Sequence, residues 1–244
     1  MIKSEFISEF DRIIELNPHI VKPTTEQVEQ LFALTEIMQE VNSYMNLTAI
    51  TDLTGVILKH YVDSLAVSPY IPENSTVIDV GCGAGFPSLP LAITRPDLLI
   101  TPLDSTAKRI RYVQDTADKL GLANISAVAA RAEEYGNKLE HRESFDVAVA
   151  RAVADLPVLT ELCLPFVKVG GCFVSMKAAK GDEELEKASN AIKVCGGKVK
   201  DIVRSDITAN SVDFEQRRLF VIEKSQHTPN NYPRNFGRIQ KKPL

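Results

Sequence analysis

The chain has 244 residues, enough for one large domain or for one domain with a small unit appended. Its 44 % hydrophobic and 25 % charged residues exclude a disordered or fibrous protein. The net charge of -4 is small, and the apolar runs fall short of the roughly 18 residues that cross a bilayer. The first ten residues, MIKSEFISEF, have neither the apolar stretch nor the cleavage site of a signal peptide, so we expect a cytoplasmic protein without membrane contact.

The first 75 residues predict helices. Apolar residues recur at helical spacing in 4–16, and Thr24 with Gln27 forms a capping box that begins a second amphipathic helix. A third helix is predicted over 54–68. Amphipathic stripes are more often internal packing than partner sites. We therefore expect 1–75 to be a helical extension that packs on the main domain, 76–244, and helps frame its substrate face.

A glycine loop follows in residues 77–87, which read VIDVGCGAGFP. Gly81, Gly83 and Gly85 allow the backbone to turn tightly and to approach a ligand without Cβ atoms in the way. Pro87 suits the first turn of a helix. A buried strand, a glycine loop and a helix start are how a doubly wound α/β sheet builds a nucleotide-type pocket. The alternative is a tight turn with no ligand.

The spacing of this loop distinguishes between two cofactors. G-x-G-x-G differs from the G-x-G-x-x-G of dinucleotide enzymes. Asp79 stands two residues before the first glycine, where it can order the loop or meet a cationic ligand. D-x-G-x-G-x-G resembles the first motif of class I S-adenosylmethionine (SAM) methyltransferases. Because SAM has no pyrophosphate and carries sulfonium and ammonium groups, a nearby acid suits it better than NAD.

From residue 76 onward, strands and helices alternate. Strands are predicted over 76–80, 98–103, 125–130, 145–150, 170–176, 199–207 and 217–224, and helices near 87–94, 105–120, 155–168 and 182–195. Alternation of this kind predicts a largely parallel sheet. Only the loop 208–216 joins the last two strands, so we expect an antiparallel hairpin at one edge. Seven strands ending in a hairpin resemble the Rossmann-like sheet of class I SAM methyltransferases, an α/β fold.

Polar residues at the strand ends are candidates for the site, because ligands of such sheets lie beyond the carboxyl ends of the strands. Asp104 follows the second strand and either binds a ribose diol or caps the next helix. Glu133 follows the third and either accepts from an adenine amino group or belongs to a polar loop. Arg151 ends the fourth, where a charge is costly unless it is paired or lies at a site. Lys177 follows the fifth.

Seven segments then occur in one order. They are NLTAI (46–50), HYVDSL (60–65), DVGCGAGFP (79–87), LDSTAKR (103–109), RAEE (131–134), ARAVADL (150–156) and YPRNFGRIQKKPL (232–244). Over roughly 40–244 the chain thus resembles the bacterial 16S rRNA guanine-N7 methyltransferase family, RsmG or GidB (glucose-inhibited division protein B). The resemblance implies SAM-dependent methylation of N7 of a single guanine in the 530 loop of 16S rRNA, in the small ribosomal subunit or its assembly intermediate.

The resemblance also implies a cofactor site. Its contacts fall on Gly81, Phe86, Ala132, Glu133 and Arg151, to which the strand-end argument adds Asp104. Guanine N7 has a lone pair and no proton, so no general base is expected, and Arg151 and Lys177 would position the reactants. Arg151 binds either the cofactor or the O6/N7 edge of the guanine. No metal is expected. The chain lacks the N-P-P-Y and Pro-Cys motifs of amine and pyrimidine methylation. Ser88 departs from the family pattern, which usually has glycine there.

Cations are the candidates for RNA binding, because phosphate contacts supply most of the affinity. Residues 1–75 carry 4 basic and 11 acidic residues, whereas 76–244 carry 24 and 21. The predicted RNA-binding residues are Lys108, Arg109, Arg131, Lys177, Arg234 and Arg238, with the tail 232–244 as a clamp. Tyr232 and Phe236 either stack on a base or anchor this tail. The alternative is a solvated basic tail.

The four cysteines are widely spaced and form no C-x-x-C pair, so neither a zinc site nor a disulfide framework is expected. We expect a monomer. Because fold does not fix substrate, three other functions stay open. They are a SAM-dependent methyltransferase for another RNA or a small molecule, an NAD-linked oxidoreductase, and a non-catalytic module that binds the ribosome.

Overall fold

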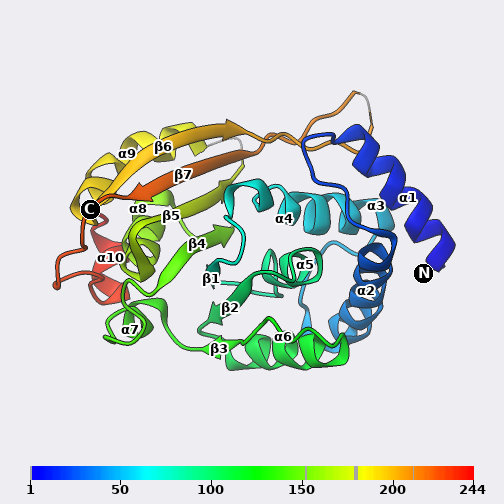
Figure 1. The fold of residues 1–244 in the computed structure, drawn as a ribbon, viewed down its shortest axis with the longest axis horizontal. Helices are drawn as coiled ribbons and strands as arrows, with labels where there is room; N and C mark the ends of the chain where they lie inside the picture. The colour runs from blue at the N-terminus through cyan, green and yellow to red at the C-terminus, as the bar shows by residue number, and fades with distance from the viewer. Residues whose placement is uncertain (1, 152, 179–180, 211) are drawn as a thin grey trace.

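The computed structural model describes residues 2–151, 153–178, 181–210 and 212–244. At its centre is a seven-stranded sheet in the order β3-β2-β1-β4-β5-β7-β6 (Figure 1). The strands are β1 (Thr76–Val80), β2 (Leu99–Asp104), β3 (Val128–Ala129), β4 (Phe145–Arg151), β5 (Val167–Lys177), β6 (Gly197–Arg204) and β7 (Arg218–Lys224).

The pairing confirms the predicted fold class. β1 pairs in parallel with β2 and β4, and the parallel pairing extends to β3 on one side and β5 on the other. β7 lies between β5 and β6 and is antiparallel to both, which is the expected edge hairpin. The strand order reverses between β1 and β4, so a ligand crevice is expected at the carboxyl ends of these two strands.

Several predicted boundaries were wrong; the strand predicted over 199–207, for example, ends at Arg204. The third strand is only two residues long, although Ile125 makes an isolated parallel bridge with Ile100. The helix predicted over 155–168 ends at Cys163 and continues as a short 3-10 turn, after which β5 begins at Val167. Pro165 lies in that turn and has no N–H to continue the helical ladder.

Helices cover both faces of the sheet (Figure 1). The helices after β1 are α5 (Ser88–Thr94), α6 (Ala107–Lys119), α7 (Ala132–Tyr135), α8 (Leu156–Cys163), α9 (Gly181–Val194) and α10 (Phe236–Lys241). Alternate residues of each strand face opposite sides. Val77 packs in the core with α5 and α6, whereas Ile78 packs in a second core with α8, α9 and α10.

The N-terminal helices α1 (Lys3–Leu16) and α2 (Thr25–Met45) share the core of α5 and α6. Both bonds of the predicted capping box, between Thr24 and Gln27, are present. The third predicted helix comprises α3 (Leu53–Gly55), a π-helical segment (Val56–Val62) and α4 (Asp63–Leu65). In the described part of the chain, no helix is long and apolar enough to cross a membrane.

Candidate active site

The glycine loop between β1 and α5 requires its three glycines. Gly81, Gly83 and Gly85 have φ of 78°, 57° and 85°, in the region that other L-residues rarely adopt. A Cβ atom on Gly81 would lie 2.6 Å from a methyl group of Val153, and one on Gly85 would lie 2.6 Å from Leu89. A Cβ on Gly83 would meet nothing within 4 Å, so this glycine faces open space.

The buried side chain of Asp79 helps to order this loop. Its side chain is fully buried, and one carboxylate oxygen accepts a hydrogen bond from Ser88 Oγ at 2.5 Å. Burial raises the pKa of Asp79 to about 6. Of the two roles considered for this acid, the structure therefore supports the ordering of the loop. Ser88, where the family usually has glycine, supplies the hydroxyl that donates this hydrogen bond.

A cavity of about 340 Å³ lies on the glycine loop. It is lined by four of the predicted cofactor residues, Gly81, Phe86, Asp104 and Arg151. The predicted Ala132 and Glu133 do not line it; they lie at the start of α7, nearby along the sheet edge. The remaining lining residues are Leu47, Thr48, His60, Cys82, Gly83, Ala84, Arg109 and Val153.

Two carboxylates stand beside this glycine-loop cavity. Asp104 accepts hydrogen bonds from the backbone N–H groups of Gly83 at 3.1 Å and Thr106 at 2.8 Å, so it links the loop to the start of α6. Glu133 is buried, and its Oε1 has no hydrogen-bond partner among the described residues. Arg131 Nη1 lies 3.7 Å from that oxygen. An oriented buried acceptor of this kind suits a ligand amino group.

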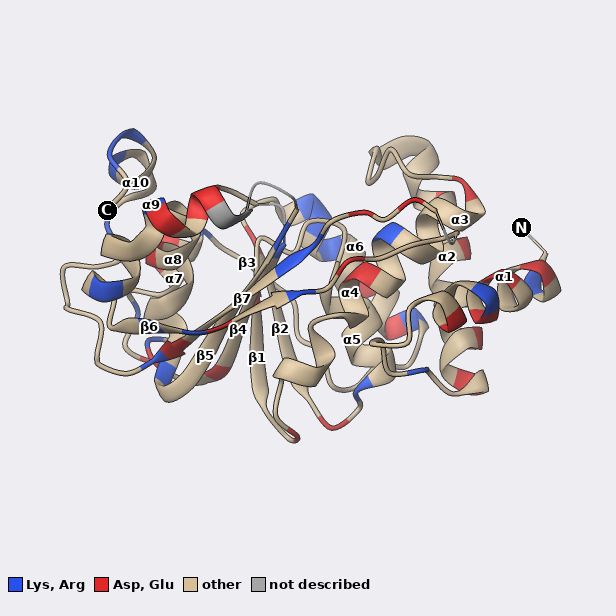
Figure 2. Ribbon diagram, turned by 90° about the horizontal axis from the view of Figure 1, so that it is seen from above, with Lys and Arg blue, Asp and Glu red and all other residues tan. Residues whose placement is uncertain are grey.

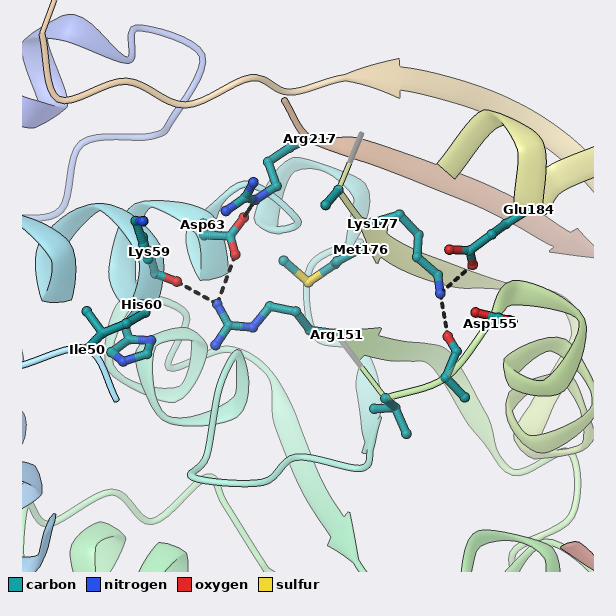
Figure 3. Close-up of a pocket in the computed structure, with 13 residues that line it drawn as sticks. Ile50, Lys59, His60, Asp63, Arg151, Asp155, Met176, Lys177, Glu184 and Arg217 are labelled. Atoms are coloured by element: carbon teal, nitrogen blue, oxygen red, sulfur yellow. Dashed lines mark hydrogen bonds and ion pairs between the residues drawn. The ribbon is translucent and has the colours of Figure 1, made fainter. Parts of the chain in front are cut away.

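Figure 3 shows a second cavity, of about 550 Å³. It shares His60, Arg151 and Val153 with the first cavity. Four cationic and three anionic side chains surround it. It is also lined by Ile50, Lys59, Asp63, Ala154, Asp155, Met176, Lys177, Ala178, Glu184 and Arg217.

Arg151 lies at the junction of the two cavities. Its Nη1 donates to the carbonyl of Lys59 at 2.9 Å and to Asp63 Oδ2 at 3.0 Å. The guanidinium carbon lies 5.4 Å from the ring centroid of Phe86. Nε and Nη2 have no protein partner within the described ranges, so the edge of the guanidinium that makes bidentate contacts is available to a ligand.

His60 completes the junction. Its ring stacks on Phe86 at 4.4 Å between centroids, and Nε2 lies 2.9 Å from Thr48 Oγ1. Burial, followed by the charge of Arg151, lowers the pKa of His60 to about 4, so the imidazole is neutral at pH 7. The sequence reasoning assigned no role to His60, Asp63 or Arg217. The HYVDSL motif was the available signal for the first two.

Lys177 lies in the second cavity, as a positioning residue should, but its ammonium group is engaged. The side chain is 8 % exposed and forms an ion pair with Glu184 at 2.7 Å. Its Nζ also donates to the carbonyl of Ala154.

Four of the other predicted RNA-binding residues lie on the surface. Lys108 and Arg109 are exposed in the first turn of α6, and Arg131 and Arg238 are exposed beside α7 and in α10. Figure 2 shows Lys and Arg residues, in blue, at the start of α6, at the start of β7 and on α10, along the upper side of that view.

Arg234 differs from these cations. Its Nε and Nη2 donate to the carboxylate of Glu161 at 2.8 and 2.6 Å, and its backbone N–H donates to the same carboxylate at 2.8 Å. Glu161 is fully buried in α8. Phe236 packs against the same core. These contacts anchor the tail and, for Phe236, favour the anchoring role over stacking on a base.

The sheet topology, with a glycine-loop cavity at the carboxyl ends of β1 and β2, defines the fold of the class I SAM-dependent methyltransferases. Solved structures share this fold. TYW2 from M. jannaschii, in complex with AdoMet, is 18 % identical with a TM-score of 0.50, covering 62 % of this chain and 70 % of that one. A SAM-dependent methyltransferase from Aquifex aeolicus is 16 % identical with a TM-score of 0.51, covering 70 % and 93 %.

Residues 27–212 match the family model described as rRNA small subunit methyltransferase G. The protein of that name from Acetivibrio thermocellus is 46 % identical, covering 90 % of this chain and 89 % of its own. Its counterpart from Alkaliphilus metalliredigens is 47 % identical, covering 94 % and 95 %. The chain therefore belongs to the rRNA small subunit methyltransferase G family. This confirms the resemblance found in the sequence and contradicts the oxidoreductase alternative.

Proposed function

We propose that this protein transfers the methyl group of SAM to N7 of a single guanine in the 530 loop of 16S rRNA. The observation that carries the proposal is the junction of the two cavities at His60, Arg151 and Val153. A cofactor on the glycine loop and a base in the second cavity would meet there. SAM supplies an electrophilic methyl group on a cationic sulfur.

The residues on the cofactor side fit this ligand. Gly83 leaves open space above the loop, and Asp104 stands at the carboxyl end of β2, where a ribose diol is bound in such folds. Glu133 offers a buried oxygen that has no hydrogen-bond partner among the described residues and suits an amino group. Arg151 offers a free guanidinium edge, suited to a carboxylate. We expect Gly81, Phe86 and Ala132 to contribute shape and backbone contacts.

The groups around the junction agree with a reaction that needs no general base. Asp63 and Glu184 are held in ion pairs, and His60 is neutral with a depressed pKa. Burial raises the pKa of the Cys82 thiol well above its usual value, so it is unsuited to covalent attack on a pyrimidine. Positioning of N7 against the methyl group then supplies the rate enhancement.

The RNA would approach along the exposed cations. Lys108, Arg109, Arg131 and Arg238 lie on the surface and are available to phosphates, with α10 held in place by the anchored tail. We propose that a monomer acts in the cytoplasm on the small subunit or on its assembly intermediate. A module that binds the ribosome without turnover would use the same surface but would not need the cofactor cavity.

Transfer of labelled methyl groups tests the proposal. The protein is incubated with methyl-labelled SAM and with 30S subunits from a strain that lacks the modification, with 50S subunits as the control. We expect label in 16S rRNA only. In parallel, S-adenosylhomocysteine at 100 times its Kd should stabilise the fold by about 2.7 kcal/mol, whereas NADH should not. Absence of label in every ribosomal substrate would refute the proposed function.

A further inference from the structure

One carboxylate connects the two cavities. Asp63 Oδ2 accepts from Arg151 Nη1 at 3.0 Å, and Asp63 Oδ1 accepts from Arg217 Nε at 2.8 Å (Figure 3). All three side chains are largely buried, with 10 %, 15 % and 18 % exposure for Asp63, Arg151 and Arg217. A carboxylate shared by two guanidinium groups keeps both of them in place.

The three residues come from distant parts of the chain. Asp63 follows the π-helical segment, Arg151 ends β4, and Arg217 immediately precedes β7. The π-helical segment also directs the carbonyl of Lys59 to Arg151 Nη1. Single π-turns of this kind often occur at functional sites. The N-terminal segment thus contributes directly to the junction of the cavities.

Arg217 is held on the side of the second cavity. It lines only that cavity, whereas Arg151 lines both. Beyond Asp63, Arg217 Nη2 donates to Glu215 at 3.0 Å and Nη1 donates to the carbonyl of Gln216. Each terminal nitrogen retains one N–H. The N–H groups of a guanidinium donate readily to the oxygens of a phosphate.

The bonds of Asp63 also determine which edge of Arg151 is free. Because Nη1 is occupied by Asp63 and the Lys59 carbonyl, rotation of the guanidinium is blocked, and Nε with Nη2 remains at the junction. Without Asp63, two guanidinium groups would repel each other at the same place. The carboxylate therefore fixes both position and orientation.

We infer that Asp63 is a positioning residue that holds Arg151 at the cofactor junction and presents Arg217 to the phosphodiester of the target nucleotide. The inference rests on the proposed function, because it assigns the second cavity to the nucleotide that is methylated. It gives Arg217, which the sequence did not single out, a direct contact with the RNA.

Three variants separately test the positioning of Arg151 and the phosphate contact of Arg217. Asp63→Asn removes the negative charge that Arg151 and Arg217 share. Arg217→Gln removes the cation that lines only the second cavity. Asp146→Asn is the matched control, because this carboxylate is partly buried and bound to Thr76 and Lys168 away from both cavities. Each variant is measured for its Tm, its Kd for S-adenosylhomocysteine by calorimetry, and its kcat and KM with 30S subunits.

Arg217→Gln should raise KM for 30S roughly tenfold and reduce the salt dependence of RNA binding by about one phosphate contact, with the Kd of S-adenosylhomocysteine unchanged. Asp63→Asn should change KM and the salt dependence in the same way. It should also raise the Kd of S-adenosylhomocysteine roughly tenfold and lower kcat, because Arg151 loses its orientation. Asp146→Asn should lower Tm alone.

Wild-type cofactor affinity and kcat in Asp63→Asn would overturn the positioning role. A wild-type KM and salt dependence in Arg217→Gln would overturn the phosphate contact, and this variant decides that point even where Asp63→Asn does not fold. If the wild-type protein methylated no ribosomal RNA, the proposed function would fail. The cofactor affinity of Asp63→Asn would still decide whether Asp63 positions Arg151 at the cofactor site.

Discussion

The contact between Arg234 and Glu161 predicts a large effect on stability for a residue that the sequence assigned to RNA. Arg234→Ala removes both side-chain bonds to a fully buried carboxylate and leaves the charge of Glu161 without its partner. Breaking a buried ion pair in this way costs about 3–5 kcal/mol. For a chain of this size each kcal/mol lowers Tm by roughly 2–4 °C, so we expect a fall of roughly 6–20 °C.

Thermal unfolding of Arg234→Ala beside Arg238→Ala measures this effect. Arg238 is exposed in α10, and its replacement should change the free energy of unfolding by no more than about 0.5 kcal/mol. The pair Glu161→Leu with Arg234→Met should recover most of the lost stability, because it leaves no unpaired charge. Equal Tm values for Arg234→Ala and Arg238→Ala would refute the anchoring role.

Three other changes have defined outcomes. Gly81→Ala places a Cβ against Val153 at a φ of 78°, so calorimetry should show weaker binding of S-adenosylhomocysteine as well as a lower Tm; unchanged values would contradict the close contact. Asp104→Ala leaves two backbone N–H groups without their acceptor, and we expect roughly tenfold weaker binding in the same titration. Asp79→Asn tests the buried acid. Its pKa is raised from 3.8 to about 6 in the fold, so its contribution to stability is present below pH 4 and is lost as the pH rises through 6. Urea unfolding should therefore show Asp79→Asn gaining about 2 kcal/mol relative to wild type between pH 4 and pH 7, and a constant difference would show that the pKa is not raised.

The sequence predicted the parts of the fold whose signals are local. The glycines of 81–85 predict a loop with positive φ angles, and the alternation of apolar strands and helices predicts the sheet. The loop 208–216 is too short for a crossover helix, which predicts the antiparallel edge. Asp104 and Arg151 were found because strand ends meet at one edge of a parallel sheet.

Contacts between distant segments were not predictable. Asp63 binds Arg151 and Arg217 across 88 and 154 residues. Arg234 resembled the exposed cations of its tail because the buried Glu161 lies 73 residues away. A cation in a sequence reveals its charge, whereas its partner depends on packing. The π-helical turn likewise has no sequence signal comparable to a capping box.

Chemical mapping of the methyl group tests the central claim most directly. N7-methylguanosine carries a positively charged ring that borohydride reduces, after which aniline cleaves the RNA chain at that nucleotide. Unmodified 30S subunits treated with this protein and SAM should yield 16S rRNA with a single new cleavage, at one guanine of the 530 loop. Incorporated methyl groups that produce no cleavage, or cleavage at several guanines, would contradict the account.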